Sequence, residues 1–167
     1  MASSNKPTSD TLLSTATAYF QVFTTMDPDV ISHIQSDDYT HEFAPASLNM
    51  SGTRTKETFA SHLKHLAGVL ESFPVSIKQT WVNPSLNQVT VWAVSETKFH
   101  EHVKDNDDEE EWKFHGEYIF ILDMDETGQK VKHVFEFLDS KATENLRLLA
   151  ARAFKKKEEV ESKRVSS

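Results

Sequence analysis

Cysteine is absent from this sequence of 167 residues. Disulfide bridges, thiolate zinc sites, iron–sulfur clusters and cysteine nucleophiles are therefore excluded. Glycine is scarce as well, with only four residues, and the chain has no phosphate-binding glycine loop, nucleophile elbow or dinucleotide fingerprint. Any catalysis by this chain is expected to need no cofactor and to consist of proton transfer on a small apolar molecule.

Long hydrophobic runs are missing too. The first ten residues are polar and lack the apolar run of about seven or more residues that a secretory signal needs. No stretch approaches the roughly 20 consecutive apolar residues of a membrane span. These absences favour a cytoplasmic protein that has no membrane partner.

What remains is the composition of a folded, acidic domain. Hydrophobic residues make up 38% and charged residues 26%, as in ordinary globular proteins. The 18 Lys and Arg residues against 26 Asp and Glu residues give a formal charge of −8, which repels a phosphate backbone, so no nucleic-acid partner is expected. We predict one domain over residues 11–154, preceded by a flexible leader of residues 1–10 and followed by a charged tail of residues 155–167.

Three amphipathic helices are predicted in the first part of the chain. Apolar residues recur at helical spacing from Leu12 to Phe23, with Ser9 or Asp10 as the N-cap. A second, shorter helix begins at Asp27-Pro28, where the aspartate is the cap and the proline lies in the first turn. A third helix begins at Thr55 and carries one apolar stripe, made of Phe59, Leu63, Leu66 and Leu70.

Alternation typical of strands begins after Pro74. Strands are predicted at residues 39–43, 75–81, 89–102, 112–123 and 131–139, and the short turns between the last four favour an antiparallel meander. A final helix, capped by Ser140, points Leu146, Leu149 and Ala153 inward. Helices packed on one face of a curved antiparallel sheet make an α+β domain shaped like a cone, and its open end is the expected pocket.

Three passages give this order of elements a likeness to a known family. They are Asp38-Tyr39-Thr40-His41, the stretch Gly116-Glu-Tyr-Ile-Phe120, and Lys130-Val-Lys-His-Val-Phe-Glu-Phe-Leu-Asp139. Together they resemble the first, penultimate and closing strands of the SnoaL-like branch of the nuclear transport factor two-like superfamily, which includes polyketide cyclases, isomerases, dehydratases and epoxide hydrolases. The resemblance spans roughly residues 12–152 and implies the same cone-shaped fold.

The resemblance places Glu136 at the position of the family's general base. Glutamate stands here in place of the family's aspartate, and the histidine that the cyclases carry on a central strand has no counterpart near Thr97. Alternation leaves open which face of the last strand looks inward. The family match points Val134, Glu136 and Leu138 to the pocket, whereas the more apolar set is Val131, His133, Phe135 and Phe137.

Two further residues are candidates for the chemistry. His41 lies on a short strand at the expected pocket mouth, where an imidazole can polarise a carbonyl or carry a proton, although a structural histidine bonded to the backbone fits the sequence as well. Tyr118 lies on the apolar face of its strand, so its hydroxyl is expected to be buried and to bond either a ligand oxygen or another protein group. Phe43, Trp92 and Phe120 are predicted to form apolar walls, or to serve in packing.

Histidine pairs and an acidic run are weaker signals. His62 with His65, and His100 with His102, have spacings that permit shared metal ligation, but neither pair has a third ligand in the sequence pattern. Leu63 and Leu66 place the first pair on the polar side of its helix, so no metal site is expected. The acidic run at residues 105–111 lacks the glycine and spacing of a calcium loop and is predicted to be a solvated turn.

The leading functional hypothesis is a cofactor-free isomerase, cyclase or lyase of SnoaL-like type. It would act on a polyketide- or terpenoid-like carbonyl compound, with Glu136 moving the proton and His41 and Tyr118 binding the oxygen. The alternative is a non-catalytic module of the same fold that stores a small apolar ligand or mediates assembly. In either case the surplus of apolar residues on both faces of the last strand predicts a homodimer through the outer face of the sheet.

Overall fold

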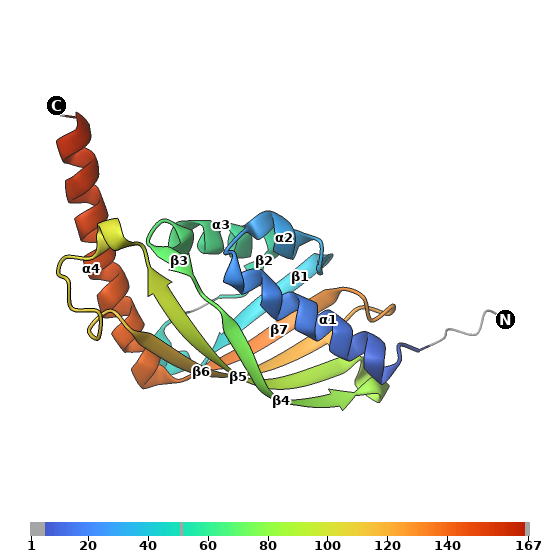
Figure 1. Cartoon of the computed structure of the whole chain (residues 1–167). Coiled ribbons are helices and arrows are strands. Elements are labelled where there is room, and N and C mark those ends of the chain that lie inside the picture. Colours follow the sequence, from blue (N-terminus) through green and yellow to red (C-terminus); the bar gives the residue numbers. More distant parts are fainter. Residues whose placement is uncertain (1–5, 51, 166–167) are drawn as a thin grey trace.

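The computed structural model describes residues 6–50 and 52–165, and residues 1–5 of the expected leader lie outside this part of the chain. Figure 1 shows a curved sheet with helices over one face and a long helix at one end. The elements, in chain order, are α1 (Ser9–Gln21), α2 (Pro28–Ser32), β1 (Gln35–Ala44), β2 (Arg54–Thr55), α3 (Lys56–Ala67), β3 (Leu70–Ser72), β4 (Val75–Asn83), β5 (Gln88–Phe99), β6 (Phe114–Met124), β7 (Val131–Leu138) and α4 (Ser140–Val165). The predicted α+β architecture is confirmed.

The N-caps of α2 and α3 are the predicted residues, whereas those of α1 and α4 are not. Asp27 caps α2 by accepting the amide of Asp29, and Thr55 caps α3 in a reciprocal pair with Thr58, both as predicted. The cap of α1 is Thr8, whose side chain accepts the amide of Thr11, and not Ser9 or Asp10, because the helix begins one residue earlier than the apolar stripe indicates. The cap of α4 also differs from the predicted one.

Asp139, rather than Ser140, satisfies the first amides of α4. Its Oδ1 accepts the backbone amides of Lys141 and Ala142 at 3.0 and 3.2 Å. The carboxylate also lies at the positive end of the helix dipole, which favours its charge. From there α4 runs without a break to Val165, through most of the range that the sequence indicates as a charged tail.

The sheet combines the predicted meander with one parallel pair. Strands β4, β5, β6 and β7 pair in antiparallel order, and β1 adds to the far side of β7 in parallel orientation. The parallel register sets His41 beside Val134 and Phe43 beside Glu136. Two segments almost a hundred residues apart therefore bring their side chains to the same place on the concave face.

Helices α1, α2 and α3 cover the concave face, and the core lies between them and the sheet (Figure 1). On β6 the inward positions Phe114, Tyr118, Phe120 and Leu122 are buried and alternate with exposed residues, as the sequence predicts. Removing one such aromatic side chain from water contributes about 2–3 kcal/mol. The described residues include no helix that is both long and apolar enough to cross a bilayer.

A bulge decides which face of β7 looks inward. Val131 pairs with Met124 and His133 pairs with Asp123, so Lys132 is one extra residue on this strand. Because the bulge resets the alternation, the inward set changes partway along the strand. Val131, Val134, Glu136 and Leu138 are buried, whereas Phe135 is half-buried and Phe137 is 46% exposed.

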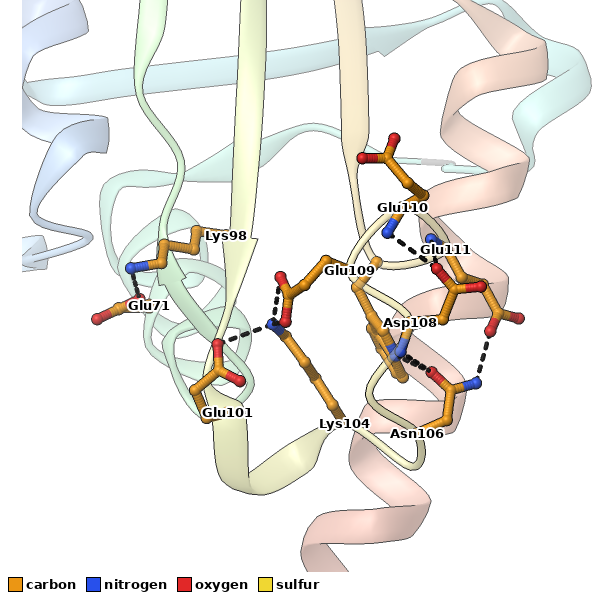
Figure 2. Close-up of polar contacts among 10 residues, drawn as sticks. Glu71, Lys98, Glu101, Lys104, Asn106, Asp108, Glu109, Glu110 and Glu111 are labelled. Carbon is orange, nitrogen blue, oxygen red and sulfur yellow. Dashed lines mark hydrogen bonds and ion pairs between the residues drawn. The ribbon is translucent and has the colours of Figure 1, made fainter.

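The acidic run folds as an ordered loop between β5 and β6. Lys104 donates to Glu101 at 2.7 Å and to Glu109 at 2.9 Å (Figure 2). Arg152 of α4 pairs with Asp105 at 2.5 Å. Residues 105–111 are all exposed, as expected of a solvated turn, and the ion pair with Arg152 ties this loop to α4.

Candidate functional site

A cavity of about 180 Å³ lies between the concave face of the sheet, α3 and α4. A 150 Å³ apolar cavity is known to hold a benzene ring, so this space suits one ring or a ring-sized part of a larger molecule. Its wall is mostly apolar and contains a few polar groups. The lining residues are Phe23, Met26, Phe43, Met50, Phe59, His62, Leu63, Leu66, Phe73, Tyr118, Glu136, Leu138, Thr143, Leu146, Arg147 and Ala150.

Helix α4 and the segment after β1 complete one side of this cavity. Leu146 and Ala150 of α4 and Met50 of the segment between β1 and β2 contribute lining side chains. Arg147 donates to the backbone oxygen of Leu48 at 2.5 Å and ties that segment to the helix. The geometry of this side therefore depends on a contact between residues 99 positions apart.

Glu136 lines the cavity, and its carboxylate is bound to His41. The Nε2 atom of His41 lies 2.8 Å from Oε2 of Glu136, and the imidazole is completely buried. The ring of His41 stacks on Phe59, with 4.7 Å between the ring centroids. His41 does not line the cavity, so it contacts the carboxylate and not the space in which a ligand would lie.

Two buried tyrosines extend this contact into a chain of hydrogen bonds. The hydroxyl of Tyr39 lies 2.8 Å from Nδ1 of His41, and the hydroxyl of Tyr19 lies 2.8 Å from that of Tyr39. Burial raises the pKa of both tyrosines, so both stay protonated at neutral pH. When Tyr39 donates to Nδ1 of His41, the ring proton lies on Nε2 and is donated to Glu136, which fixes one tautomer.

Tyr118 also reaches the cavity, through a gap left by a glycine. Its hydroxyl lies 2.9 Å from Oγ of Ser95, and burial raises its pKa. A Cβ atom on Gly116 would lie 2.0 Å from this hydroxyl, so only glycine permits the position. When Ser95 donates to Tyr118, the Tyr118 proton stays available for an acceptor in the cavity.

The predicted apolar walls have three different placements. Phe43 lines the cavity. Phe120 is buried but packs edge-on against Phe20 of α1, with centroids 4.8 Å apart, and lies in the core outside the lining. Trp92 lies on the opposite face of the sheet, 39% exposed, where its indole donates to Glu117 at 2.6 Å. Its expected place in the wall is corrected, because alternation along β5 turns its neighbours Val91 and Ala93 inward.

His62 is the lining residue that the sequence interpretation missed. It faces the cavity from α3, with its ring edge-on to Phe43 at a centroid distance of 6.2 Å. Burial lowers its pKa to about 4, with a further contribution from the positive charge of Arg54. The signal was present in the spacing, since His62 follows Phe59 by three residues and precedes Leu66 by four, on one helix face.

The other predicted histidine pair does not form a site. Strand β5 ends at Phe99. Beyond it, the rings of His100 and His102 stack on each other, with 5.3 Å between their centroids. Within residues 6–50 and 52–165 no three His, Asp or Glu side chains are grouped as metal ligands. The polar groups that the cavity brings together are therefore one carboxylate, one phenol, one neutral imidazole, one hydroxyl and one guanidinium, from Glu136, Tyr118, His62, Thr143 and Arg147.

This arrangement can accept a proton from an apolar molecule. Oε2 of Glu136 is bound to His41, whereas Oε1 has no hydrogen bond to any described residue, and Glu136 lines the cavity. A carboxylate oxygen that no protein group occupies can accept a proton from a molecule bound beside it. The phenol of Tyr118 in the same wall supplies a donor for an oxygen that gains charge.

Known proteins share this architecture. No family model matches the chain. The austinoid biosynthesis clusters protein H of Penicillium brasilianum is 29% identical over 134 residues, which are 80% of this chain and 86% of that protein. AusH of Aspergillus nidulans has a TM-score of 0.70 and 24% identity over 80% of this chain and 87% of its own. The BvnE pinacolase of Penicillium brevicompactum has a TM-score of 0.74 and 18% identity over 86% and 96%. The chain therefore has the nuclear transport factor two-like fold that the resemblance implies.

Proposed function

We propose that this chain is an enzyme of small-molecule metabolism that transfers a proton within a carbonyl compound, as an isomerase, cyclase or lyase does. The observation that carries the proposal is the buried His41–Glu136 pair whose carboxylate opens onto an apolar cavity. The reaction needs no cofactor, because the carboxylate alone can take and return the proton.

The proposed chemistry starts at a carbon next to the carbonyl group. Oε1 of Glu136 removes a proton from that carbon, so the C–H bond breaks and the carboxyl O–H bond forms. The electron pair of the C–H bond becomes the C=C bond of an enolate, and its oxygen accepts a hydrogen bond from Tyr118. Glu136 then returns the proton to another atom of the same molecule, or a leaving group departs from the neighbouring carbon.

His41 acts through Glu136 and is a positioning residue in this scheme. Its N–H donates to Oε2 and leaves Oε1 directed at the ligand, while Tyr39 fixes the tautomer. Tight positioning matters because a reacting geometry has to be held to about 0.5 Å. The chain of tyrosines contributes rigidity and does not contact the ligand.

The relatives support a role in the biosynthesis of small organic molecules. Among the similar proteins, the name of one places it in an austinoid biosynthesis cluster, and the name of another gives it pinacolase activity. For this chain we propose a polyketide- or terpenoid-like carbonyl substrate. Because the cavity measures about 180 Å³, it would enclose the reacting ring of such a molecule and leave the remainder near α4.

A bicyclic ketone with activated protons, β-tetralone, provides the test of this proposal. Incubation with the full chain in deuterated buffer is expected to speed deuterium incorporation next to the carbonyl well beyond the buffer rate, as followed by NMR. Toluene fits the cavity but has no carbonyl group, so it should inhibit competitively. Incorporation at the buffer rate, or a rate that toluene leaves unchanged, would count against the proposal.

A second candidate function is assembly through the outer face of the sheet. Trp92, Ile119 and Phe137 form one row across β5, β6 and β7 and are 39%, 37% and 46% exposed. A continuous apolar row on a sheet face is typical of an interaction surface. We propose that it joins two copies of this chain in a homodimer, which is compatible with catalysis in each copy.

A further inference from the structure

His62 has hydrogen-bonding capacity that residues 6–50 and 52–165 do not use. It lines the cavity together with Glu136, but it comes from α3 and not from the sheet. Its ring packs edge-on to Phe43 at an interplanar angle of 66°. Neither ring nitrogen has a hydrogen bond to any residue within the described ranges. His62 is half-buried, and an imidazole beside an apolar cavity whose nitrogens have no bond to these residues can take its partner from a ligand.

The surroundings keep this imidazole uncharged. Burial lowers the pKa of His62 to about 4, and the positive charge of Arg54 acts in the same direction. The guanidinium of Arg54 lies over the ring of Phe43, 5.4 Å from its centroid, and so places a permanent cation close by. At neutral pH His62 therefore offers one N–H donor and one acceptor nitrogen.

We propose that His62 is a second recognition point in the cavity, which hydrogen-bonds to an uncharged oxygen of the ligand. This oxygen is a hydroxyl or carbonyl group other than the carbonyl that reacts at Glu136. The inference rests on the proposed function and narrows its substrate class to apolar molecules with two oxygen functions. A neutral imidazole forms no ion pair, and the carboxylate of Glu136 in the same wall repels an anionic ligand, so an uncharged oxygen is the expected partner of His62.

The test compares ring-sized probes that differ in one group. Phenol and toluene have nearly the same shape, and only phenol has a hydroxyl group; benzoate carries a negative charge. Their affinities for the full chain are measured by NMR titration near neutral pH. We expect phenol to bind about five-fold tighter than toluene, the effect of one neutral hydrogen bond, and benzoate to bind more weakly than phenol.

Two variants assign the preference to one residue. His62→Phe keeps a ring of similar size without nitrogen atoms and should bind phenol and toluene equally. The matched control is His65→Phe, three residues along α3, where the ring stacks on Phe154 and does not line the cavity. It should keep the full preference for phenol. His62→Gln keeps a donor and an acceptor and should restore part of the preference.

A spectroscopic measurement separates recognition from a packing role. Phenol should shift the imidazole nitrogen resonances of His62, whereas toluene should leave them nearly unchanged. The inference is overturned if the phenol preference is absent, if it persists in His62→Phe, or if it disappears in Glu136→Gln instead. Deuterium exchange into β-tetralone reports separately on the proposed function. Exchange without a His62-dependent preference removes this inference alone, and the preference without exchange removes the catalytic proposal alone.

Discussion

Nε2 of the fully buried His41 lies 2.8 Å from Oε2 of Glu136, on the neighbouring parallel strand. One face of the carboxylate is thereby fixed by protein, and the other borders an apolar cavity.

Replacing His41 tests its positioning role. His41→Phe removes the donor to Glu136 and leaves Tyr39 without an acceptor, so we expect proton exchange to slow about 10-fold or more and stability to fall by roughly 1–3 kcal/mol. His41→Gln keeps an N–H donor and should recover part of the rate. Deuterium incorporation and urea unfolding measure the two effects. If the exchange rate falls only in proportion to the loss of stability, and equally in both variants, His41 has a purely structural role.

The two buried tyrosines predict how stability changes at alkaline pH. Burial raises the pKa of Tyr19 and Tyr39 above the ordinary value of 10.0, so the folded state keeps their protons when the unfolded state has lost them. Their stabilising contribution is therefore complete below about pH 10 and declines as the pH rises further. The free energy of unfolding, measured by urea titration across this range, should fall above pH 10 and fall less steeply in Tyr19→Phe. An equal slope in both proteins would contradict this assignment.

Gly116 is expected to be essential for the position of Tyr118. In Gly116→Ala the new Cβ would lie 2.0 Å from the Tyr118 hydroxyl and 2.9 Å from Oγ of Ser95, so the tyrosine has to move. We expect a loss of about 1–3 kcal/mol in stability and a slower exchange reaction. Gly68→Ala is the control, because its Cβ would meet mainly the flexible end of Lys157. Thermal unfolding in which both variants match the wild type would show that the close approach is unimportant.

The outer apolar row predicts a dimer that a single charge disrupts. Phe137→Asp puts a carboxylate in the middle of the row and should yield a monomer in sedimentation velocity experiments at micromolar concentration. Leu148→Asp on α4 changes a residue that is even more exposed but lies outside the sheet, and it should leave the dimer intact. A monomeric wild-type protein would remove the proposal of a homodimer.

Much of the fold follows from local signals. Helical spacing, the Asp27-Pro28 start and alternation after Pro74 predict the helices and strands β4 to β7, because each signal reflects the packing needs of its own segment. Such local signals do not predict which face of β7 points inward. Its bulge at Lys132 depends on pairing with β6, and pairing is a property of two strands rather than of one.

The candidate site was only partly predictable for the same reason. The contact between His41 and Glu136 depends on the parallel pairing of β1 with β7, which a local pattern does not encode. Tyr39 shares a strand face with His41 at a spacing of two, so its role was open to inference, whereas the contact of Tyr19 depends on how α1 packs on the sheet. Trp92 was misplaced because both faces of β5 carry apolar residues.

The central claim is that the carboxylate of Glu136 accepts the proton, and the most direct measurement compares deuterium incorporation into β-tetralone by two variants. Glu136→Gln removes the base within the cavity, and Glu42→Gln makes the same change at an exposed position on β1. Phenol affinity verifies that each variant keeps an intact cavity. The account predicts a rate at least about 100-fold lower than wild type for Glu136→Gln and an unchanged rate for Glu42→Gln. Unchanged exchange in a folded, phenol-binding Glu136→Gln variant would contradict it.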